Sequence, residues 1–96
     1  MPRTRFLVSY DISDPKRLRK VACLLEGFGT RLQYSVFECA LDGLRLAELK
    51  SELHPVLNFS EDQVLFVSLG PNSEDASLHI EALGLPYTVR SRVTVI

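Results

Sequence analysis

Residues 30–41 form one extended segment, Thr-Arg-Leu-Gln-Tyr-Ser-Val-Phe-Glu-Cys-Ala-Leu, that lies between two amphipathic helical patterns. This segment is long for a single strand, so we expect a bend or a break into two strands near Tyr34 and Ser35. If it breaks, the chain order becomes strand, helix, strand, strand, helix, strand. A chain of 96 residues has room for one domain of this kind. We therefore predict a single α+β domain over residues 1–96.

The two helical patterns begin and end at recognisable signals. Asp14-Pro15 predicts a helix start, because aspartate caps the first turn and proline fits the first helical position. This helix runs to about residue 28, and its buried stripe is predicted to contain Leu18, Val21, Ala22, Leu25 and Phe28. A second helix is predicted over residues 44–53, with Leu46, Leu49 and Leu53 facing inward. Both patterns have the three- and four-residue spacing of helices that pack on one side.

The remaining apolar patterns predict strands. Phe6, Val8 and Tyr10 alternate with polar residues over 5–11, and residues 64–69 form a continuous apolar run that is typical of a central strand. Residues 78–83 fit a short helix or a strand equally well, and residues 87–95 alternate as a strand does. The order matches a ferredoxin-like βαββαβ sandwich with helices on one face. We expect a second copy to cover the other face, giving a homodimer in which residues 78–96 contact the partner.

Composition and charge narrow the class of protein. A hydrophobic content of 46% with 24% charged residues is ordinary for a globular domain. No apolar run approaches the ~20 residues of a membrane helix, and no secretory signal is seen, so we expect a cytoplasmic protein without a membrane partner. Cys23 and Cys39 are interpreted as small apolar fillers, and neither His54 nor His79 has neighbours that suggest a catalytic or metal site.

The net charge of −1 hides an uneven distribution. Residues 1–31 hold seven basic and three acidic side chains, a net charge of +4, whereas residues 32–89 carry −7 and residues 90–96 carry +2. Four of the basic residues lie on the first helix outside its apolar stripe, namely Lys16, Arg17, Arg19 and Lys20. They could contact a phosphate backbone, or they could form an ordinary solvated helix face.

Asp11 is the acidic residue of greatest interest. It ends the first strand just before the basic helix, where a carboxylate could hold Mg²⁺ or could simply cap a turn. Arg17 and Arg31 could bind phosphate through the guanidinium fork or form surface salt bridges. Phe37 shares its predicted strand face with Ser35 and Gln33, so we expect partial exposure, with base stacking or packing in a core or dimer interface as its role.

Taken together, two groups of residues resemble a known family. They are Tyr10-Asp11-Ile12 with Asp14 and Arg17, and, after the helix, Gly29, Arg31, Gln33 and Ser35-Val36-Phe37-Glu38. The combination resembles the CRISPR-associated protein two family, over residues 6–70. The resemblance implies a ferredoxin-like fold and a homodimer with an exchanged C-terminal strand region.

The resemblance also implies a function. It implies Mg²⁺-dependent cleavage of phosphodiesters in single-stranded RNA or double-stranded DNA, with Asp11 as metal ligand and catalytic residue. Arg17, Arg31 and Phe37 match further positions linked to activity, and the nucleic-acid-binding set is Lys16, Arg17, Arg19, Lys20 and Arg31. The alternative is a non-catalytic subunit that bridges two dimers of the CRISPR-associated integrase and binds the DNA to be inserted. An unrelated ferredoxin-like binding module is a third hypothesis.

Overall fold

The computed structural model describes residues 2–87 and contains the predicted order of elements. The order is β1 (Thr4–Asp11), α1 (Pro15–Glu26), β2 (Thr30–Gln33), β3 (Val36–Leu41), α2 (Gly43–Leu53) and β4 (Gln63–Pro71), followed by a 3₁₀-helix over Ala76–Leu78. The strands form one antiparallel sheet in the order β2-β3-β1-β4. This strand order with two crossover helices confirms the ferredoxin-like prediction.

The long extended segment does divide where the sequence indicated. Residues 34 and 35 form the turn between β2 and β3, and the backbone N–H of Tyr10 donates to Ser35 O at 3.1 Å. The turn between β2 and β3 therefore lies beside the end of β1, from which the chain passes into α1.

The predicted cap of α1 is also present, since the Asp14 carboxylate accepts a hydrogen bond from the backbone N–H of Arg17 at 3.0 Å.

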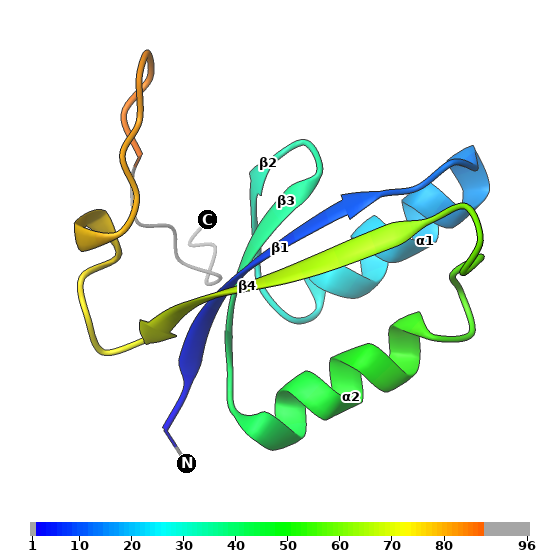
Figure 1. Cartoon of the computed structure of the whole chain (residues 1–96), viewed down its shortest axis with the longest axis horizontal. Helices are drawn as coiled ribbons and strands as arrows, with labels where there is room; N and C mark the ends of the chain where they lie inside the picture. The colour runs from blue at the N-terminus through cyan, green and yellow to red at the C-terminus, as the bar shows by residue number, and fades with distance from the viewer. Residues whose placement is uncertain (1, 88–96) are drawn as a thin grey trace, which may run out of the picture.

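One face of the sheet is covered by both helices and holds the core (Figure 1). Strand residues on this face include Val8, Phe37 and Cys39, which are at most 1% exposed. The helices contribute the predicted stripe, with Val21, Leu25 and Leu49 fully buried. The periodicity of the two helices therefore predicted this side of the molecule well.

Gly29 allows the turn after α1 to approach β3 closely. A Cβ at this position would lie 2.3 Å from Glu38 O and 2.5 Å from the Cys39 Sγ. Real Cβ atoms do not approach backbone this closely, so the entry into β2 requires glycine here.

The other face of the sheet has no helix on it. Residues of this open face are the alternate ones along each strand, including Leu7 and Asp11 on β1, Glu38 on β3 and Leu65 and Val67 on β4. Leu65 and Val67 are 48% and 46% exposed. The strand pair β1–β4 is apolar on both faces, and exposed apolar side chains that gather on one face are typical of a surface that contacts another molecule.

Three expectations from the sequence are wrong. Residues 64–69 lie at the edge of the sheet and not at its centre, because the apolar run reflects two apolar faces and not two neighbouring strands. Cys23 is exposed and so is not a core filler, whereas Cys39 is buried as expected. Residues 79–83 form neither helix nor strand.

The end of the chain falls partly outside the described residues. The predicted strand over 87–95 lies outside them except for Tyr87, so its pairing stays a prediction. The segment after β4 extends from the side of the sheet away from the helices (Figure 1), and Leu83 and Leu85 in it are 101% and 90% exposed. In residues 2–87, no helix has both the length and the apolar character needed to cross a membrane.

Candidate functional site

Asp11 lies at the end of β1, on the open face, next to Gln63 of β4. Its side chain is exposed. Within residues 2–87, no group donates a hydrogen bond to the Asp11 carboxylate. Asp11 therefore does not cap the following turn, which was the alternative role that the sequence offered. A carboxylate with free oxygens at the rim of an apolar face is chemically able to bind a hard cation through direct or water-mediated contacts.

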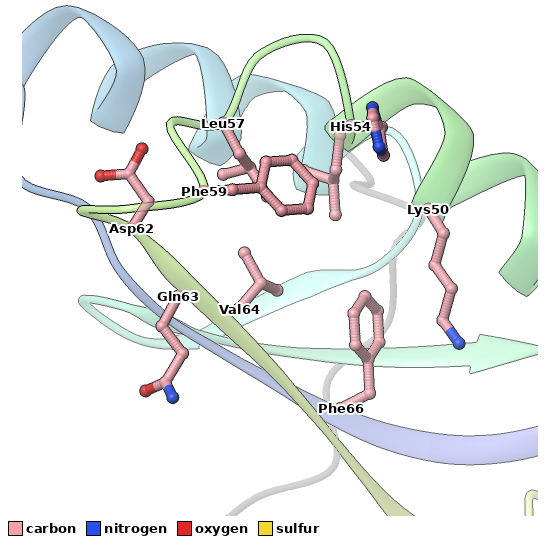
Figure 2. A pocket seen from close by; sticks show the side chains of 9 residues that line it. Lys50, His54, Leu57, Phe59, Asp62, Gln63, Val64 and Phe66 are labelled. Atoms are coloured by element: carbon pink, nitrogen blue, oxygen red, sulfur yellow. The ribbon is translucent and has the colours of Figure 1, made fainter.

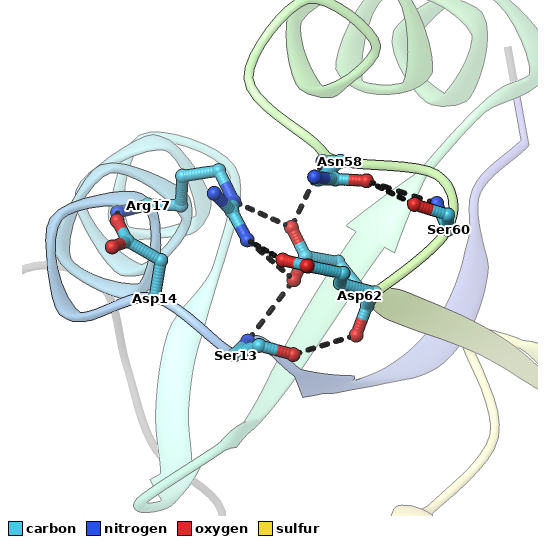
Figure 3. A network of polar contacts seen from close by, with 7 residues as sticks. Ser13, Asp14, Arg17, Asn58, Ser60 and Asp62 are labelled. Carbon is cyan, nitrogen blue, oxygen red and sulfur yellow. Dashed lines mark hydrogen bonds and ion pairs between the residues drawn. The ribbon is translucent and has the colours of Figure 1, made fainter.

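Arg17 is engaged by two carboxylates of the loop between α2 and β4 (Figure 3). Its Nε donates to Asp62 Oδ2 at 2.8 Å, and its Nη2 donates to Asp62 Oδ1 at 3.2 Å and to Glu61 Oε1 at 3.1 Å. The Asp62 side chain has no exposed surface. Arg17 thus joins the start of α1 to a loop 45 residues later in the chain.

The Asp62 carboxylate is satisfied on all sides. Besides Arg17, the backbone N–H of Ser13 donates to Oδ1 at 3.0 Å and that of Asn58 donates to Oδ2 at 2.9 Å. The hydrogen bonds from the Arg17 guanidinium hold the pKa of Asp62 well below its usual range, and the two backbone donors act in the same direction. This Arg17–Asp62 clamp makes Arg17 a structural residue as well as a candidate phosphate ligand.

Arg31 occupies the helix-covered face of β2, opposite to Asp11. It pairs in register with Phe37, and its guanidinium carbon lies 5.1 Å from the centroid of the Phe37 ring. Arg31 Nη1 also donates to the backbone oxygen of Tyr34 at 2.7 Å, and the hydroxyl of Tyr10 donates to the same oxygen at 3.1 Å. Arg31 therefore fixes the turn between β2 and β3.

The expected partial exposure of Phe37 is wrong, because its ring is 0% exposed. The expectation depended on side chains alternating between the two faces along residues 30–41. The turn at residues 34–35 and a register shift between Arg31 and Gln33 interrupt that alternation. Phe37 consequently points into the core with Tyr10, whose ring centroid is 6.1 Å away. The packing role is confirmed, and in this conformation Phe37 has no surface on which a base could stack.

The other basic residues of α1 are free of the clamp. Lys16, Arg19 and Lys20 are all exposed, on the side of α1 that faces away from the sheet. Asp11 ends the strand that leads into this helix, and Arg17 is bound to Asp62, the residue before the Gln63 that pairs with Asp11. The start of the basic helix and the candidate metal ligand therefore belong to the same end of the sheet, and no direct contact joins Asp11 to these cations within residues 2–87.

A second polar group on the open face was not predicted. Arg5 Nη1 lies 2.5 Å from Glu38 Oε2, and the hydroxyl of Tyr87 donates to Glu38 Oε1 at 2.7 Å. Burial and the hydrogen bond to Glu38 raise the pKa of Tyr87 to about 12. Only the alternation that puts Arg5 and Glu38 on the same face could have suggested this contact.

The described residues contain no group of three or more histidine, cysteine or acidic side chains placed to hold a metal ion. Asp11, the metal ligand that the family resemblance implied, therefore has no pair of other acidic, histidine or cysteine side chains beside it within residues 2–87. Asp62, the acidic residue of the clamp, was missed as a structural residue because its partner is far away in sequence.

Comparison with known proteins finds a matching family and similar relatives. The family model described as CRISPR associated protein Cas2 matches residues 4–76. A protein named CRISPR-associated endoribonuclease Cas2 1, from Rhodospirillum rubrum, is 41% identical over 91 residues, which cover 95% of this chain and 88% of the relative.

Two solved structures have the same fold. Streptococcus pyogenes Cas2 at pH 6.5 is 34% identical, with a TM-score of 0.73 over 83% of this chain and 99% of that one. A chain of the partial Cas6-RT-Cas1–Cas2 complex is 26% identical, with a TM-score of 0.69 over 90% of this chain and 97% of that one.

Proposed function

The chain belongs to the CRISPR associated protein Cas2 family, and from that premise we propose that it is a Mg²⁺-dependent endonuclease that acts as a homodimer. Its substrate class is the phosphodiester bond of single-stranded RNA or double-stranded DNA. The observation that carries the proposal is the position of Asp11, an exposed carboxylate at the rim of an apolar face that accepts no hydrogen bond from residues 2–87. The names of relatives support the reaction type, since the Rhodospirillum rubrum protein is called an endoribonuclease.

The homodimer is supported by the open face of the sheet. Leu65 and Val67 expose about half of their surface on this face, and covering such surface with a second copy removes it from water. If the two open faces meet around a two-fold axis, each chain contributes its own Asp11 from the same rim. Two carboxylates near one axis repel each other, and a divalent cation relieves that repulsion.

Asp11 has the chemistry that Mg²⁺ requires. It is an oxygen ligand without competing donors, and Mg²⁺ binds through one or two carboxylates while it keeps several waters. The bound ion would supply Lewis acidity toward a phosphoryl oxygen. Asp11 itself would hold the ion, and the apolar rim formed by Leu65 would limit the access of bulk water.

Nucleic-acid binding is supported by the charges of α1. Lys16 and Arg17 lie in the first turn and the last turn has no basic residue, which is the reverse of what the helix dipole favours. Cations at this end do not stabilise the helix, so their presence calls for another purpose. Lys16, Arg19 and Lys20 are free to contact phosphates of a duplex on the outer side of the dimer.

The alternative function is a bridge between integrase subunits, without physiological cleavage. It is favoured by the likeness to a chain of the partial Cas6-RT-Cas1–Cas2 complex. The partner in this case is the CRISPR-associated integrase.

The test is cleavage of RNA and duplex DNA panels with Mg²⁺ and with EDTA. Asp11→Asn keeps the shape of the side chain and weakens the ligand, so cleavage should fall about a thousandfold, which corresponds to roughly 4 kcal/mol of transition-state stabilisation. Glu52→Gln, which removes an exposed carboxylate from α2, is the matched control and should cleave normally.

The same panels separate the two functions. The double variant Lys16→Glu, Arg19→Glu should lose duplex affinity and salt dependence while it keeps its response to Mg²⁺. If Asp11→Asn cleaves as the unmodified protein does, the nuclease proposal is wrong and the bridge function stands.

A further inference from the structure

A cavity of about 370 Å³ lies between the end of α2, the loop that follows it and β4 (Figure 2). This volume is within the range of about 300–1,000 Å³ that is usual for small-molecule sites. Its floor is apolar, with Leu53, Leu57 and Val64. The cavity lies on the helix-covered side of β4, whereas Asp11 lies on the open face, so the two sites are separate.

Aromatic rings form the walls of this cavity. The rings of His54 and Phe59 pack at a centroid distance of 4.7 Å, and Phe66 extends from β4 toward them (Figure 2). Phe59 is 67% exposed although it is a large apolar side chain. A flat aromatic ligand that entered between Phe59 and Phe66 would cover both rings and would stack on at least one of them.

The charge of the lining favours an anion. Asp62 is the acidic residue of the lining, but its carboxylate is neutralised by Arg17 and points away from the cavity in Figure 2. Lys50 and His54 lie one helical turn apart on α2. The Lys50 Nζ lies 5.3 Å from the Phe66 ring centroid and has no carboxylate partner among the residues that the structure describes.

We propose that this cavity binds a single unstacked nucleotide, with the base between Phe59 and Phe66 and the phosphate on Lys50. A nucleotide combines a flat aromatic ring with an anion a few ångströms away, and the site offers aromatic surface and a cation in the same arrangement. Stacking of a base on an aromatic side chain tolerates any base. The site is therefore expected to select nucleotides as a class and not one base.

The proposal extends the proposed function, because a nucleotide in this cavity would be a base turned out of a strand. It does not depend on cleavage or on Asp11. Its test is carried out in EDTA, so that failure of the metal-dependent reaction and failure of the cavity give different results.

The experiment is a titration of the full chain with adenosine 5′-monophosphate, adenosine and inorganic phosphate, each followed by amide NMR. We expect weak binding of the monophosphate, with a dissociation constant of about 1 mM or below, and shifts at residues 50, 54, 59 and 66. Phe59→Ala should weaken both adenosine and its monophosphate by about tenfold. Lys50→Ala should weaken the monophosphate to the affinity of adenosine and leave adenosine unchanged.

Two controls match these variants. Arg45→Ala removes an exposed cation from α2 that does not line this cavity, and Tyr34→Ala removes an aromatic ring that is 75% exposed; both should bind the monophosphate normally. A short single-stranded oligonucleotide that shifts the same residues at lower concentration would identify a strand as the source of the nucleotide. Equal shifts by the free monophosphate would identify a soluble nucleotide.

Four results would overturn the proposal. Three of them are the absence of shifts at up to about 10 mM monophosphate, binding that does not respond to Phe59→Ala, and binding of inorganic phosphate as tight as that of the monophosphate. A site that is covered in the dimer would also overturn it, and would be seen as protection of residues 54 and 59 that increases with protein concentration.

Discussion

The two faces of the β2-β3-β1-β4 sheet are built from the same four strands but are completed in different ways. The face under α1 and α2 buries Val8 and Phe37 completely, and its polar neighbours are satisfied within the chain. The open face leaves Leu65 and Val67 about half exposed and carries Asp11 at its rim. The first face is covered by the chain's own helices, and the second is the face on which we proposed that a second copy packs.

This difference predicts separate roles for the two faces. We expect substitutions on the covered face to act mainly on the stability of the fold, and substitutions on the open face to act mainly on the proposed association. Arg31 and Phe37, which the family resemblance linked to activity, lie on the covered face. Asp11, which the same resemblance linked to the metal, lies on the open one.

The largest effect is expected on the covered face. Phe37→Ala removes a fully buried ring and should lower the free energy of unfolding by about 3–5 kcal/mol. Total stabilities are about 5–15 kcal/mol, so urea unfolding would show a much earlier midpoint. Tyr34→Ala, on the exposed turn, should leave the midpoint nearly unchanged. Equal midpoints for the two variants would contradict the division between the faces.

A smaller but more selective effect is expected on the open face. Leu65→Asp places a charge in the proposed interface and should raise the dimer dissociation constant by about 30-fold or more, the effect of losing a contact of about 2 kcal/mol. Far-ultraviolet circular dichroism should stay unchanged. Leu44→Asp, at a leucine on α2 that is 79% exposed, is the control. Equilibrium sedimentation that gives the same dissociation constant for both variants would move the interface elsewhere.

The smallest effect concerns Tyr87, which holds the end of the described chain on Glu38. Its pKa is raised from about 10 to about 12, so the contact contributes fully below pH 10 and is lost as the pH rises through about 12. Tyr87→Phe should cost about 1 kcal/mol or less. In an ultraviolet titration, this variant should lack the tyrosine that ionises near pH 12. If the variant instead loses amplitude near pH 10, the hydroxyl of Tyr87 is not bound to Glu38.

Local patterns predicted much of the fold, and failed where a distant residue decided the outcome. The Asp14 cap, both helix stripes and the break at Tyr34 and Ser35 depend on neighbours in sequence, and all are confirmed. The exposure of Phe37 was mispredicted because strict alternation does not continue through a turn. Strand β4 was misplaced because an apolar run cannot distinguish a strand with neighbours on both sides from an edge strand with apolar residues on both faces.

The candidate site shows the same limit. The sequence singled out Asp11 and the basic residues of α1, and the structure places Asp11, Lys16, Arg19 and Lys20 at the surface. The sequence offered a salt bridge as one role for Arg17, which the structure confirms, but it did not identify Asp62 as the partner, since the two residues are 45 positions apart. The cavity near Phe59 also went unnoticed, because its lining comes from a helix end, a loop and a strand that meet only in the fold.

The edge position of β4 has a consequence for the lifetime of the unpartnered chain. Within residues 2–87, β4 has a neighbouring strand on one side only, beside the apolar Leu65 and Val67, and an edge strand of this kind is a template for pairing with other extended polypeptides. If the chain is the homodimer that we propose, a newly made copy is exposed to wrong associations until its partner binds. The waiting time shortens as the concentration of the chain rises, so low expression is the condition under which aggregation and proteolysis compete best with assembly.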